Sequence, residues 1–337
     1  MFLNYNSNKM FFYFILFFST LITISSNSWL GCWIGLEINL LSFTPLISNS
    51  KNLLASEAAL KYFLTQSIAS INFLFIILLK MILLKNFEMN NLISIVINSS
   101  LLMKMGSTPF HFWFPNIIEG LSWFNCIILM TWQKISPMIL LSYYLNNYFL
   151  MIIMMLNTMV GTLGGFNQSS LRKLMTFSSI NNLGWMLAAL MISENLWMFY
   201  LILYSFMTSI MCFMFNLMNV YFINQLFIMN INSQIKISFM INFLSLGGLP
   251  PFLGFFAKWI IINFLINNNM IIISFIFIIM SLIMLFIYMR IIYSSIIFNY
   301  FKLKWFKMLI KNKYLFLLNI FSMISLLSLI FSTFFFL

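Results

Sequence analysis

Two interrupted apolar stretches decide the fold of this chain: LLMKMGSTPFHFWFP at residues 101–115 and LSLGGLPPFLGFFAKW at residues 244–259. Proline lacks the N–H group that a helix needs, and its ring collides with the preceding turn, so Pro109 interrupts the first stretch. Pro250 and Pro251 interrupt the second in the same way. Each stretch is therefore predicted to be an apolar helix that is broken along its length.

The composition places these stretches in a membrane. Of 337 residues, 63% are hydrophobic and 7% are charged, and the mean hydropathy is +1.02. Soluble domains are about 45–50% apolar and about 25% charged. The chain is therefore predicted to be an all-α integral membrane protein. The formal charge of the chain is +12. Because no soluble domain is predicted that could present this charge to nucleic acid, we interpret the basic residues as determinants of membrane topology and of lipid contact.

The apolar runs predict about eleven transmembrane helices, because a span needs roughly 20 apolar residues. The predicted spans are 9–26, 29–47, 57–80, 91–117 (interrupted), 123–146, 148–165, 170–191, 196–221, 236–266 (interrupted), 270–294 and 314–336. Connections between them are short, so residues 1–337 form a single transmembrane domain.

The two breaks lie five helices apart, and an odd offset reverses the direction of the chain in the membrane. Residues 1–147 and 148–300 are therefore predicted to be two inverted five-helix units, a plan typical of transporters. Residues 301–337 follow as a basic interfacial segment and a terminal helix. The local echo of the repeat is Gly106, Pro109 and Phe110 against Gly248, Pro250 and Phe252.

Basic residues in short loops set the predicted orientation. The N-terminal side collects Lys9, Lys51, Arg172, Lys173, Lys236 and the cluster Lys302, Lys304, Lys307, Lys311 and Lys313, whereas the opposite side has mainly Lys80 and Lys85, offset by Glu88. The N-terminus is therefore predicted on the positive-inside face and the C-terminus across the membrane. The 302–313 cluster is either a segment that touches anionic lipid head groups or a plain topogenic loop.

Four ionisable residues lie well inside the predicted spans: Glu37, Lys104, Lys134 and Lys258. An ionisable group at membrane depth costs several kcal/mol, so it indicates a functional site, most often for ion or proton movement. Each lysine is close to a proline that frees backbone carbonyls. A lysine beside such carbonyls and water can be held charged or neutral, and a proton relay needs this property.

Glu37 is the carboxylate partner that the sequence offers to these lysines. At about 7 Å and an effective dielectric constant near 20, it would interact with one lysine by roughly 2 kcal/mol. A change in one charge would then switch the protonation of its neighbour. The alternative is a buried Glu–Lys pair kept for packing specificity, which leaves two lysines without a carboxylate partner.

Three further features are open to two interpretations. His111, at the first break, either passes protons between Lys104 and a wet entry or bonds to freed backbone. Glu57 and Lys61, four residues apart, form either an exposed helical pair or a channel mouth. The sequence GTLGGF, which begins at Gly161, is explained better by close helix packing than by a nucleotide loop, because it lacks the strand and acidic partner.

The isolated cysteines Cys32, Cys126 and Cys212 form no CxxC motif, so neither an iron–sulfur site nor a disulfide framework is indicated.

Six stretches together resemble the subunit 2 family of mitochondrial proton-pumping NADH:ubiquinone oxidoreductase, respiratory complex I. They are SNSWLGCWIGLEINLLSFTPLIS, EAALKYFLTQSIAS, MKMGSTPFHFWFP, TWQKISP, NQSSLRKLMTFSSINNLGWM and LSLGGLPPFLGFFAKW. The similarity covers most of the chain and weakens after about residue 267. The resemblance implies an antiporter-like fold with two inverted five-helix units, in a form that lacks the first three helices of the bacterial version.

The resemblance also implies a role for each intramembrane charge. Glu37, Lys104, Lys134 and Lys258 match the family's proton-relay positions, and His111, Lys61, Pro109, Pro250 and Pro251 support them. The implied location is the mitochondrial inner membrane, with the N-terminus in the matrix and the C-terminus in the intermembrane space. The implied partners are other membrane-arm subunits and anionic lipids such as cardiolipin. NADH, FMN, iron–sulfur clusters and ubiquinone are expected in partner subunits, and no cofactor or metal is expected in this chain.

Two other functions remain open at this point. One is a free-standing monovalent cation/proton antiporter of the same fold, and the other is a structural subunit whose charges only hold helices together. Composition alone does not separate the antiporter from the complex I subunit. The resemblance favours the subunit.

Overall fold

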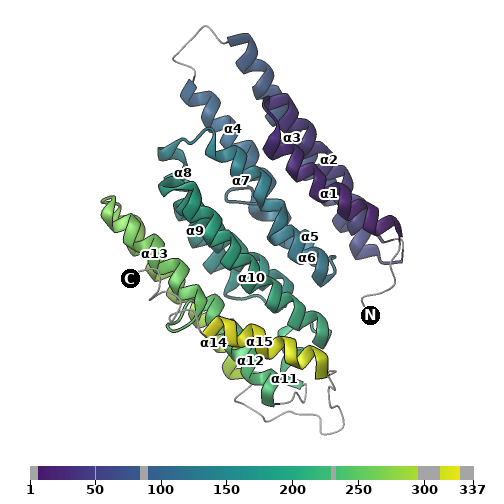
Figure 1. Cartoon of the computed structure of the whole chain (residues 1–337), viewed down its shortest axis with the longest axis vertical. Helices are drawn as coiled ribbons and strands as arrows, with labels where there is room; N and C mark the ends of the chain where they lie inside the picture. The colour runs from purple at the N-terminus through teal and green to yellow at the C-terminus, as the bar shows by residue number, and fades with distance from the viewer. Residues whose placement is uncertain (1–6, 50, 84–89, 229–232, 295–311, 327–337) are drawn as a thin grey trace. The chain divides into compact units, whose positions relative to one another are not determined.

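The computed structural model describes residues 7–49, 51–83, 90–228, 233–294 and 312–326 (Figure 1). Its regular elements are helices, and within these ranges no strand forms; a single antiparallel bridge joins Ser170 to Phe222. The prediction of an all-α fold is confirmed. The 302–311 part of the predicted basic segment lies outside the described residues.

The chain divides into two compact units, residues 1–153 and 154–337. The division falls inside α8 (Asn147–Gly165), six residues after the predicted boundary at 147. The inverted relation between the two units stays a prediction.

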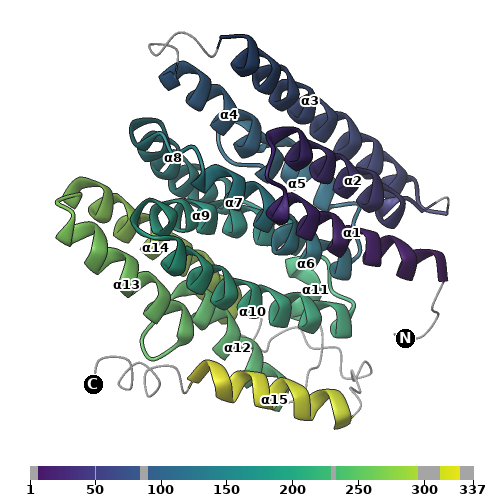
Figure 2. The ribbon, with the colours of Figure 1, turned by 45° about the horizontal axis from the view of Figure 1, so that its top comes forward.

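Unit 1 begins with three long helices that lie side by side: α1 (Ser7–Ser25), α2 (Trp29–Ile47) and α3 (Leu53–Leu83) (Figures 1 and 2). The first broken stretch follows as α4 (Asn90–Met105), the 3-10 turn η2 (Phe110–Phe112) and α5 (Trp113–Ile118). The unit continues with α6 (Trp123–Met130), the 3-10 turn η3 (Trp132–Lys134) and α7 (Ile135–Ser142). Because α4 packs against both α3 and α7, its end is buried, whereas Pro109, Phe110 and Phe112 beyond it are exposed.

Unit 2 contains the rest of α8 and then α9 (Leu171–Ile192), α10 (Glu194–Met218), α11 (Ile223–Ile228), α12 (Ser233–Gly247), α13 (Leu253–Asn267), α14 (Ile271–Ile292) and α15 (Asn312–Leu326). In α9, 83% of the membrane-length window is buried, against 28% in α14. Helix α9 is therefore the central helix of unit 2, whereas α14 presents most of its apolar surface outward. Helix α15 packs against α12 and α10 (Figure 2).

Within the described ranges, eight helices are long and apolar enough to cross a membrane. They include α1, α2, α3, α8, α9, α10 and α14, and the α6–α7 segment from Trp123 to Ser142. Large apolar side chains such as Ile82 and Ile272 are exposed on these helices, as expected where lipid is the solvent. The exact count of eleven spans stays a prediction.

The predicted span 123–146 forms a membrane-length segment from Trp123 to Ser142 that contains a break. Helix α6 ends at Met130, and η3 separates it from α7. The cause is Pro137, whose ring and missing N–H disturb the turn before it and leave residues 132–134 in the tighter 3-10 conformation. The interruption places Lys134 at the end of η3 and at the start of α7.

Candidate functional site

The backbone freed at the first break is satisfied by neighbouring groups. The Leu102 carbonyl accepts from the Ser107 N–H at 3.1 Å, and the Met103 carbonyl accepts from the indole N–H of Trp113 at 3.2 Å. From α3, the Gln66 amide donates to the Lys104 carbonyl at 3.0 Å. The end of α4 is therefore buried in protein, as the membrane environment requires.

At the second break, a lysine supplies the missing donor. The Lys258 ammonium donates a 2.9 Å hydrogen bond to the Gly247 carbonyl, one of the carbonyls that Pro250 and Pro251 deprive of a helical partner. Lys258 is also packed over Gly248, because a Cβ built on that glycine would lie 3.1 Å from the lysine nitrogen. This buried cation therefore closes the end of α12.

The two breaks use the same backbone turn. Gly106 has φ +70° and Gly248 has φ +82°, a region that favours glycine. In both breaks, the N–H of the residue after the glycine donates to the carbonyl five positions earlier. Ser107 donates to Leu102 and Leu249 donates to Leu244, as in the Schellman ending of a helix. With the glycines aligned, Pro109 corresponds to Pro251, one residue later than the sequence echo suggested. The lysines differ, since Lys104 precedes its break and Lys258 follows its own.

Glu37 and Lys104 form the charged pair of unit 1. Lys104 is buried, Glu37 on α2 is half-buried, and the Glu37 carboxylate interacts electrostatically with the Lys104 ammonium. Neither side chain joins a direct ion pair within the described part of the chain. The pair is therefore coupled through space without the direct contact that would fix both charges.

Two small cavities adjoin Lys104. The first, of about 10 Å³, is lined by Lys104 together with Asn39, Tyr62, Gln66, Gln133 and Ser136 among its polar residues. The buried Ser136 hydroxyl has no hydrogen-bond partner in the described structure. A cavity of about 10–15 Å³ with two to four polar partners holds one water molecule. The first cavity therefore has the size and the lining of a single-water site.

The second cavity, also of about 10 Å³, joins Lys104 to Lys134. Both lysines line it, with Tyr62 and Gln133 beside them. Lys134 is 1% exposed, and its ammonium lies 5.9 Å from the ring centre of Phe114. The Gln133 amide donates to the Asn39 side chain at 2.8 Å, which ties η3 to α2. Unit 1 thus places Lys104 and Lys134 on one water-sized space and Lys104 on a second, and Glu37 interacts electrostatically with Lys104 without lining either space.

Unit 2 holds the fourth predicted relay residue, Lys258 on α13. It is 7% exposed, its ammonium lies 5.8 Å from the Trp185 ring centre, and it lines a cavity of about 20 Å³. Asn182 and Tyr200 line the same cavity, and the Tyr200 hydroxyl donates to the Asn182 side chain at 2.8 Å. Lys258 therefore faces the hydrogen-bonded pair of Asn182 and Tyr200 across a cavity that can hold water.

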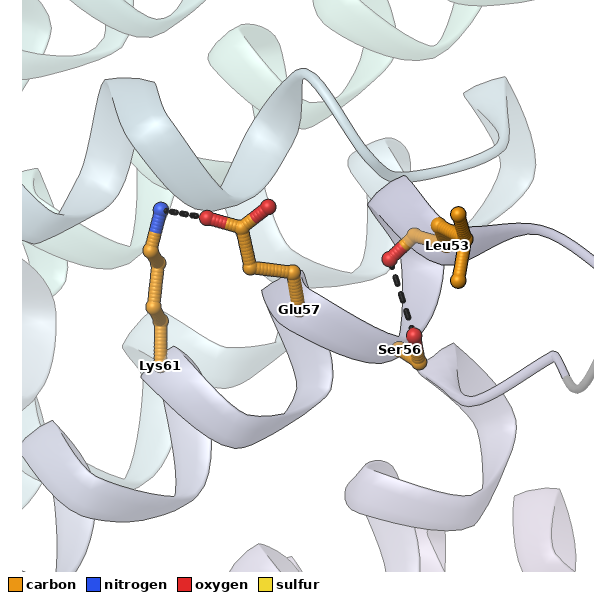
Figure 3. A network of polar contacts seen from close by, with 4 residues as sticks. All are labelled: Leu53, Ser56, Glu57 and Lys61. Carbon is orange, nitrogen blue, oxygen red and sulfur yellow. Dashed lines mark hydrogen bonds and ion pairs between the residues drawn. The ribbon is translucent and has the colours of Figure 1, made fainter.

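The structure also places the lesser candidates. His111 is half-buried in η2, where its ring interacts with the Pro109 carbonyl but its Nδ1 has no hydrogen-bond partner in the described structure; both interpretations of this residue stay predictions. Glu57 and Lys61 form an ion pair near the start of α3, and both side chains are exposed (Figure 3). This geometry fits the exposed helical pair, and a channel-mouth role stays a prediction.

The interpretation of GTLGGF as a packing motif is confirmed. A Cβ built on Gly161 would lie 2.5 Å from the backbone nitrogen of Asn181, so the bare glycine lets α8 and α9 approach closely.

Several site residues were missed from the sequence, namely Asn39, Tyr62, Gln66, Gln133 and Ser136 in unit 1, and Asn182 and Tyr200 in unit 2. All are polar residues within apolar spans, and all line a cavity beside a relay lysine. Their polarity at membrane depth was a usable signal. Which lysine each would meet depends on helix packing, which the sequence does not display.

Comparison with known proteins places the chain in a family. Residues 26–284 match the family described as NADH:quinone oxidoreductase/Mrp antiporter, TM. NADH-ubiquinone oxidoreductase chain 2 of Anopheles gambiae is 54% identical over 266 residues, which cover 78% of each chain. The protein of the same name from Locusta migratoria is 46% identical over 268 residues, 79% of this chain and 78% of that one. The chain belongs to the NADH-ubiquinone oxidoreductase chain 2 family.

Solved structures show how widely the fold of this chain 2 family member is shared. A chain in the structure of respiratory complex I from Thermus thermophilus with bound aureothin aligns over 96% of this chain and 78% of that one, with a TM-score of 0.84 and 20% identity. A chain of the Mrp complex from Dietzia aligns over 85% and 60%, with a TM-score of 0.76 and 14% identity. The antiporter-like fold expected for chain 2 is confirmed.

Proposed function

We propose that this chain is a proton-translocating core membrane subunit of respiratory NADH:ubiquinone oxidoreductase, in the mitochondrial inner membrane. The observation that carries the proposal is the water-sized cavity that Lys104 and Lys134 share, together with the electrostatic interaction between Lys104 and Glu37. Buried ionisable groups with adjoining water sites are the parts of a proton relay. Relatives at up to 54% identity carry the name of a subunit of this complex, which supports the same assembly here.

In unit 1, Glu37 sets the charge state of Lys104. A carboxylate that interacts through space favours the charged lysine, and loss of the carboxylate's charge favours release of the proton. Water in the cavity shared by Lys104 and Lys134 carries that proton onward, with Gln133 and Tyr62 as its hydrogen-bond partners. Lys134 therefore receives the proton from Lys104.

In unit 2, Lys258 holds a proton before its release to the far side. Its hydrogen bond to Gly247 stabilises the charged form, and the adjoining cavity with Asn182 and Tyr200 offers a way out. The order of steps from unit 1 to unit 2 is part of the proposal, with Lys258 as the last of the four.

The energy for these steps comes from quinone reduction in neighbouring subunits of the complex. NADH, FMN, the iron–sulfur clusters and ubiquinone are held by those subunits, and this chain supplies the proton path. The three cysteines Cys32, Cys126 and Cys212 are buried, which suits a packing role. The positive-inside rule places the N-terminus in the matrix and the C-terminus in the intermembrane space.

Replacement of Lys104 tests the proposal. The assembled complex with Lys104→Met should show reduced coupled turnover and fewer protons pumped per NADH, with assembly preserved. Lys51→Met removes the same charge from an exposed position of unit 1 and serves as the control. A normal proton stoichiometry in the assembled Lys104→Met complex would overturn the relay.

A free-standing monovalent cation/proton antiporter is the second candidate, because the family and the fold include an Mrp antiporter. This function predicts cation-dependent proton exchange by the purified single chain in liposomes. Absence of exchange, together with pumping by the complex, supports the subunit. A purely structural role predicts instead that apolar replacement of Glu37 and Lys104 together leaves pumping intact.

A further inference from the structure

Unit 2 contains a large cavity that the proposed relay does not use. Its volume is about 410 Å³, well above the cavities beside Lys104, Lys134 and Lys258 and within the range of about 300–1,000 Å³ typical of ligand sites. It is bounded by the loop that follows α8, by the short helix α11 and by the last turn of α14. A space of this size can hold a ligand larger than the single waters of the proposed relay.

The rim of the cavity is polar and carries one cation. The polar lining consists of Asn167, Gln168, Ser169, Asn224, Arg290 and Ser294, and no acidic residue is among the described residues that line it. Arg290 is exposed and forms no ion pair within the described part of the chain. A lone guanidinium among amide and hydroxyl groups matches a phosphate, which it can bind through two parallel hydrogen bonds.

The cavity also has apolar lining residues, among them Phe166, Phe227 and Ile287. The exposed ring of Phe166 stacks on that of Phe286 of α14, with the ring centres 6.1 Å apart. Toward its N-terminus, α14 continues with exposed apolar side chains such as Leu282 and Ile279. Along α14, apolar surface therefore leads up to Ile287 in the cavity lining and then to Arg290 in the last turn.

The position of the cavity agrees with the level of a lipid head group. Gly165 ends α8, Leu171 begins α9 and Arg290 lies in the last turn of α14, so the cavity sits at one end of three membrane-length helices. The same end carries Arg172 and Lys173, the basic residues predicted to face the positive-inside compartment. Such a basic face attracts anionic lipids.

The cavity wall is held in place by backbone contacts. The Ile223 N–H donates to the Ser169 carbonyl at 3.0 Å, and the Leu171 N–H donates to the Tyr221 carbonyl at 2.9 Å. The guanidinium of Arg172 stacks at 4.0 Å over the Tyr221 ring, outside the cavity. The loop after α8 and the segment before α11 thus form one fixed wall.

We infer that this cavity binds the head group of an anionic phospholipid, with Arg290 on the phosphate and an acyl chain along Phe166, Phe286 and the outer face of α14. Asn224 and Gln168 contact the remaining head-group oxygens. The lipid bridges α8, α11 and α14. Lipid binding at this site does not depend on proton transfer by the chain.

Photo-crosslinking of lipids tests the site. The full chain is placed in nanodiscs that contain a photoactivatable phosphatidylglycerol or, in a parallel sample, the matching phosphatidylcholine, and crosslinked peptides are mapped by mass spectrometry. The expected result is preferential crosslinking of phosphatidylglycerol to the peptides that contain Phe166 and Asn224. Arg290→Gln should lower that yield by about fivefold, the effect of one basic residue near a membrane surface.

Two variants and one competitor complete the test. Lys51→Gln removes an exposed charge from unit 1 and does not line the cavity, so it should leave the yield unchanged. Asn224→Trp fills the cavity without changing its charge and should also lower the yield, which keeps the test valid where Arg290→Gln does not fold. Equal yields for the two lipids, or an unchanged yield in both cavity variants, would overturn the inference. Displacement of the lipid by millimolar inorganic phosphate would assign the site to free phosphate and overturn its lipid ligand.

Discussion

The ammonium of Lys258 donates a 2.9 Å hydrogen bond to the Gly247 carbonyl, so a residue of α13 closes the end of α12 across the second helix break. We propose two duties for this one buried side chain. It satisfies a carbonyl that Pro250 and Pro251 leave without a helical donor, and it offers an exchangeable proton next to a polar cavity. Stability and proton transfer at this break are therefore expected to be separable by substitution.

Lys258→Met should lose both duties, whereas Lys258→Arg should lose only one. Methionine leaves a buried carbonyl without a donor, which costs about 1–3 kcal/mol of unfolding free energy. Arginine can donate to the same carbonyl but keeps its proton, so the fold is retained and the proton is not released. Thermal unfolding of the purified chain and proton pumping by the assembled complex measure the two effects. Normal pumping by the Lys258→Arg complex would contradict a proton-carrying role.

Gln66 supports the first break in a comparable way, from a helix that precedes it by nearly forty residues. Its amide donates to the Lys104 carbonyl at 3.0 Å in a buried setting. Gln66→Leu should destabilise the chain by about 1–3 kcal/mol, because the carbonyl then has no donor in its buried site. Proton pumping should fall as well, since the Lys104 backbone loses its anchor to α3.

Gln225→Leu is not a suitable comparison for this change because Gln225 bonds to backbone N–H groups at a different site. Gln234, an exposed glutamine near the start of α12, provides the control, and Gln234→Leu should have little effect on stability or pumping. Equal unfolding temperatures for the Gln66 and Gln234 variants would show that the Gln66 bond contributes nothing measurable.

The sequence located the charges and the breaks because both are local signals. A lysine in an apolar run and a proline in a helix are visible without any neighbour, and Lys104, Lys134 and Lys258 are all buried as predicted. The partners Tyr62 and Asn182 were not identified because their meeting with a lysine depends on how separate helices pack. The break at η3 was signalled in the sequence by Pro137, although the predicted span 123–146 runs through it.

Tyr200 offers a test of the polar pair beside Lys258. Its hydroxyl donates to the Asn182 side chain at 2.8 Å, and both residues line the Lys258 cavity. Tyr200→Phe should reduce proton pumping and lower the unfolding free energy by about 0.5–1.5 kcal/mol, the usual contribution of one hydrogen bond. Tyr148→Phe removes a hydroxyl from an exposed ring at the start of α8 and should leave both quantities unchanged. Unaltered pumping by the Tyr200→Phe complex would exclude this hydroxyl from the proton exit.

The exposed pair of α3 predicts a small effect. Glu57 and Lys61 are 57% and 46% exposed, and pairs of this kind on a helix surface contribute about 0.3–0.5 kcal/mol. Lys61→Gln should therefore change the unfolding temperature very little and should leave pumping intact. A large loss of pumping without a loss of stability would instead support the channel-mouth interpretation of this pair. Lys51→Gln, on the connection before α3, is the matched control for loss of one exposed charge.

The contact between α8 and α9 gives a test of packing that is independent of charge. A Cβ at Gly161 would lie 2.5 Å from the Asn181 backbone nitrogen, whereas a Cβ at Gly165, one turn later, would meet its nearest neighbour at 3.6 Å. Gly161→Ala must push the two helices apart and should cost about 1–3 kcal/mol, as overpacking of a core does.

Gly165→Ala adds the same methyl group in ordinary van der Waals contact and should be tolerated. Asn181 and Asn182 are consecutive on α9, so a displacement caused by the Gly161 methyl also moves the side chain that accepts from Tyr200. The Gly161→Ala complex should consequently pump less, and the Gly165→Ala complex should pump normally. Thermal unfolding and proton stoichiometry of the two alanine variants check both statements, and equal behaviour of the pair would contradict the close approach of α8 and α9.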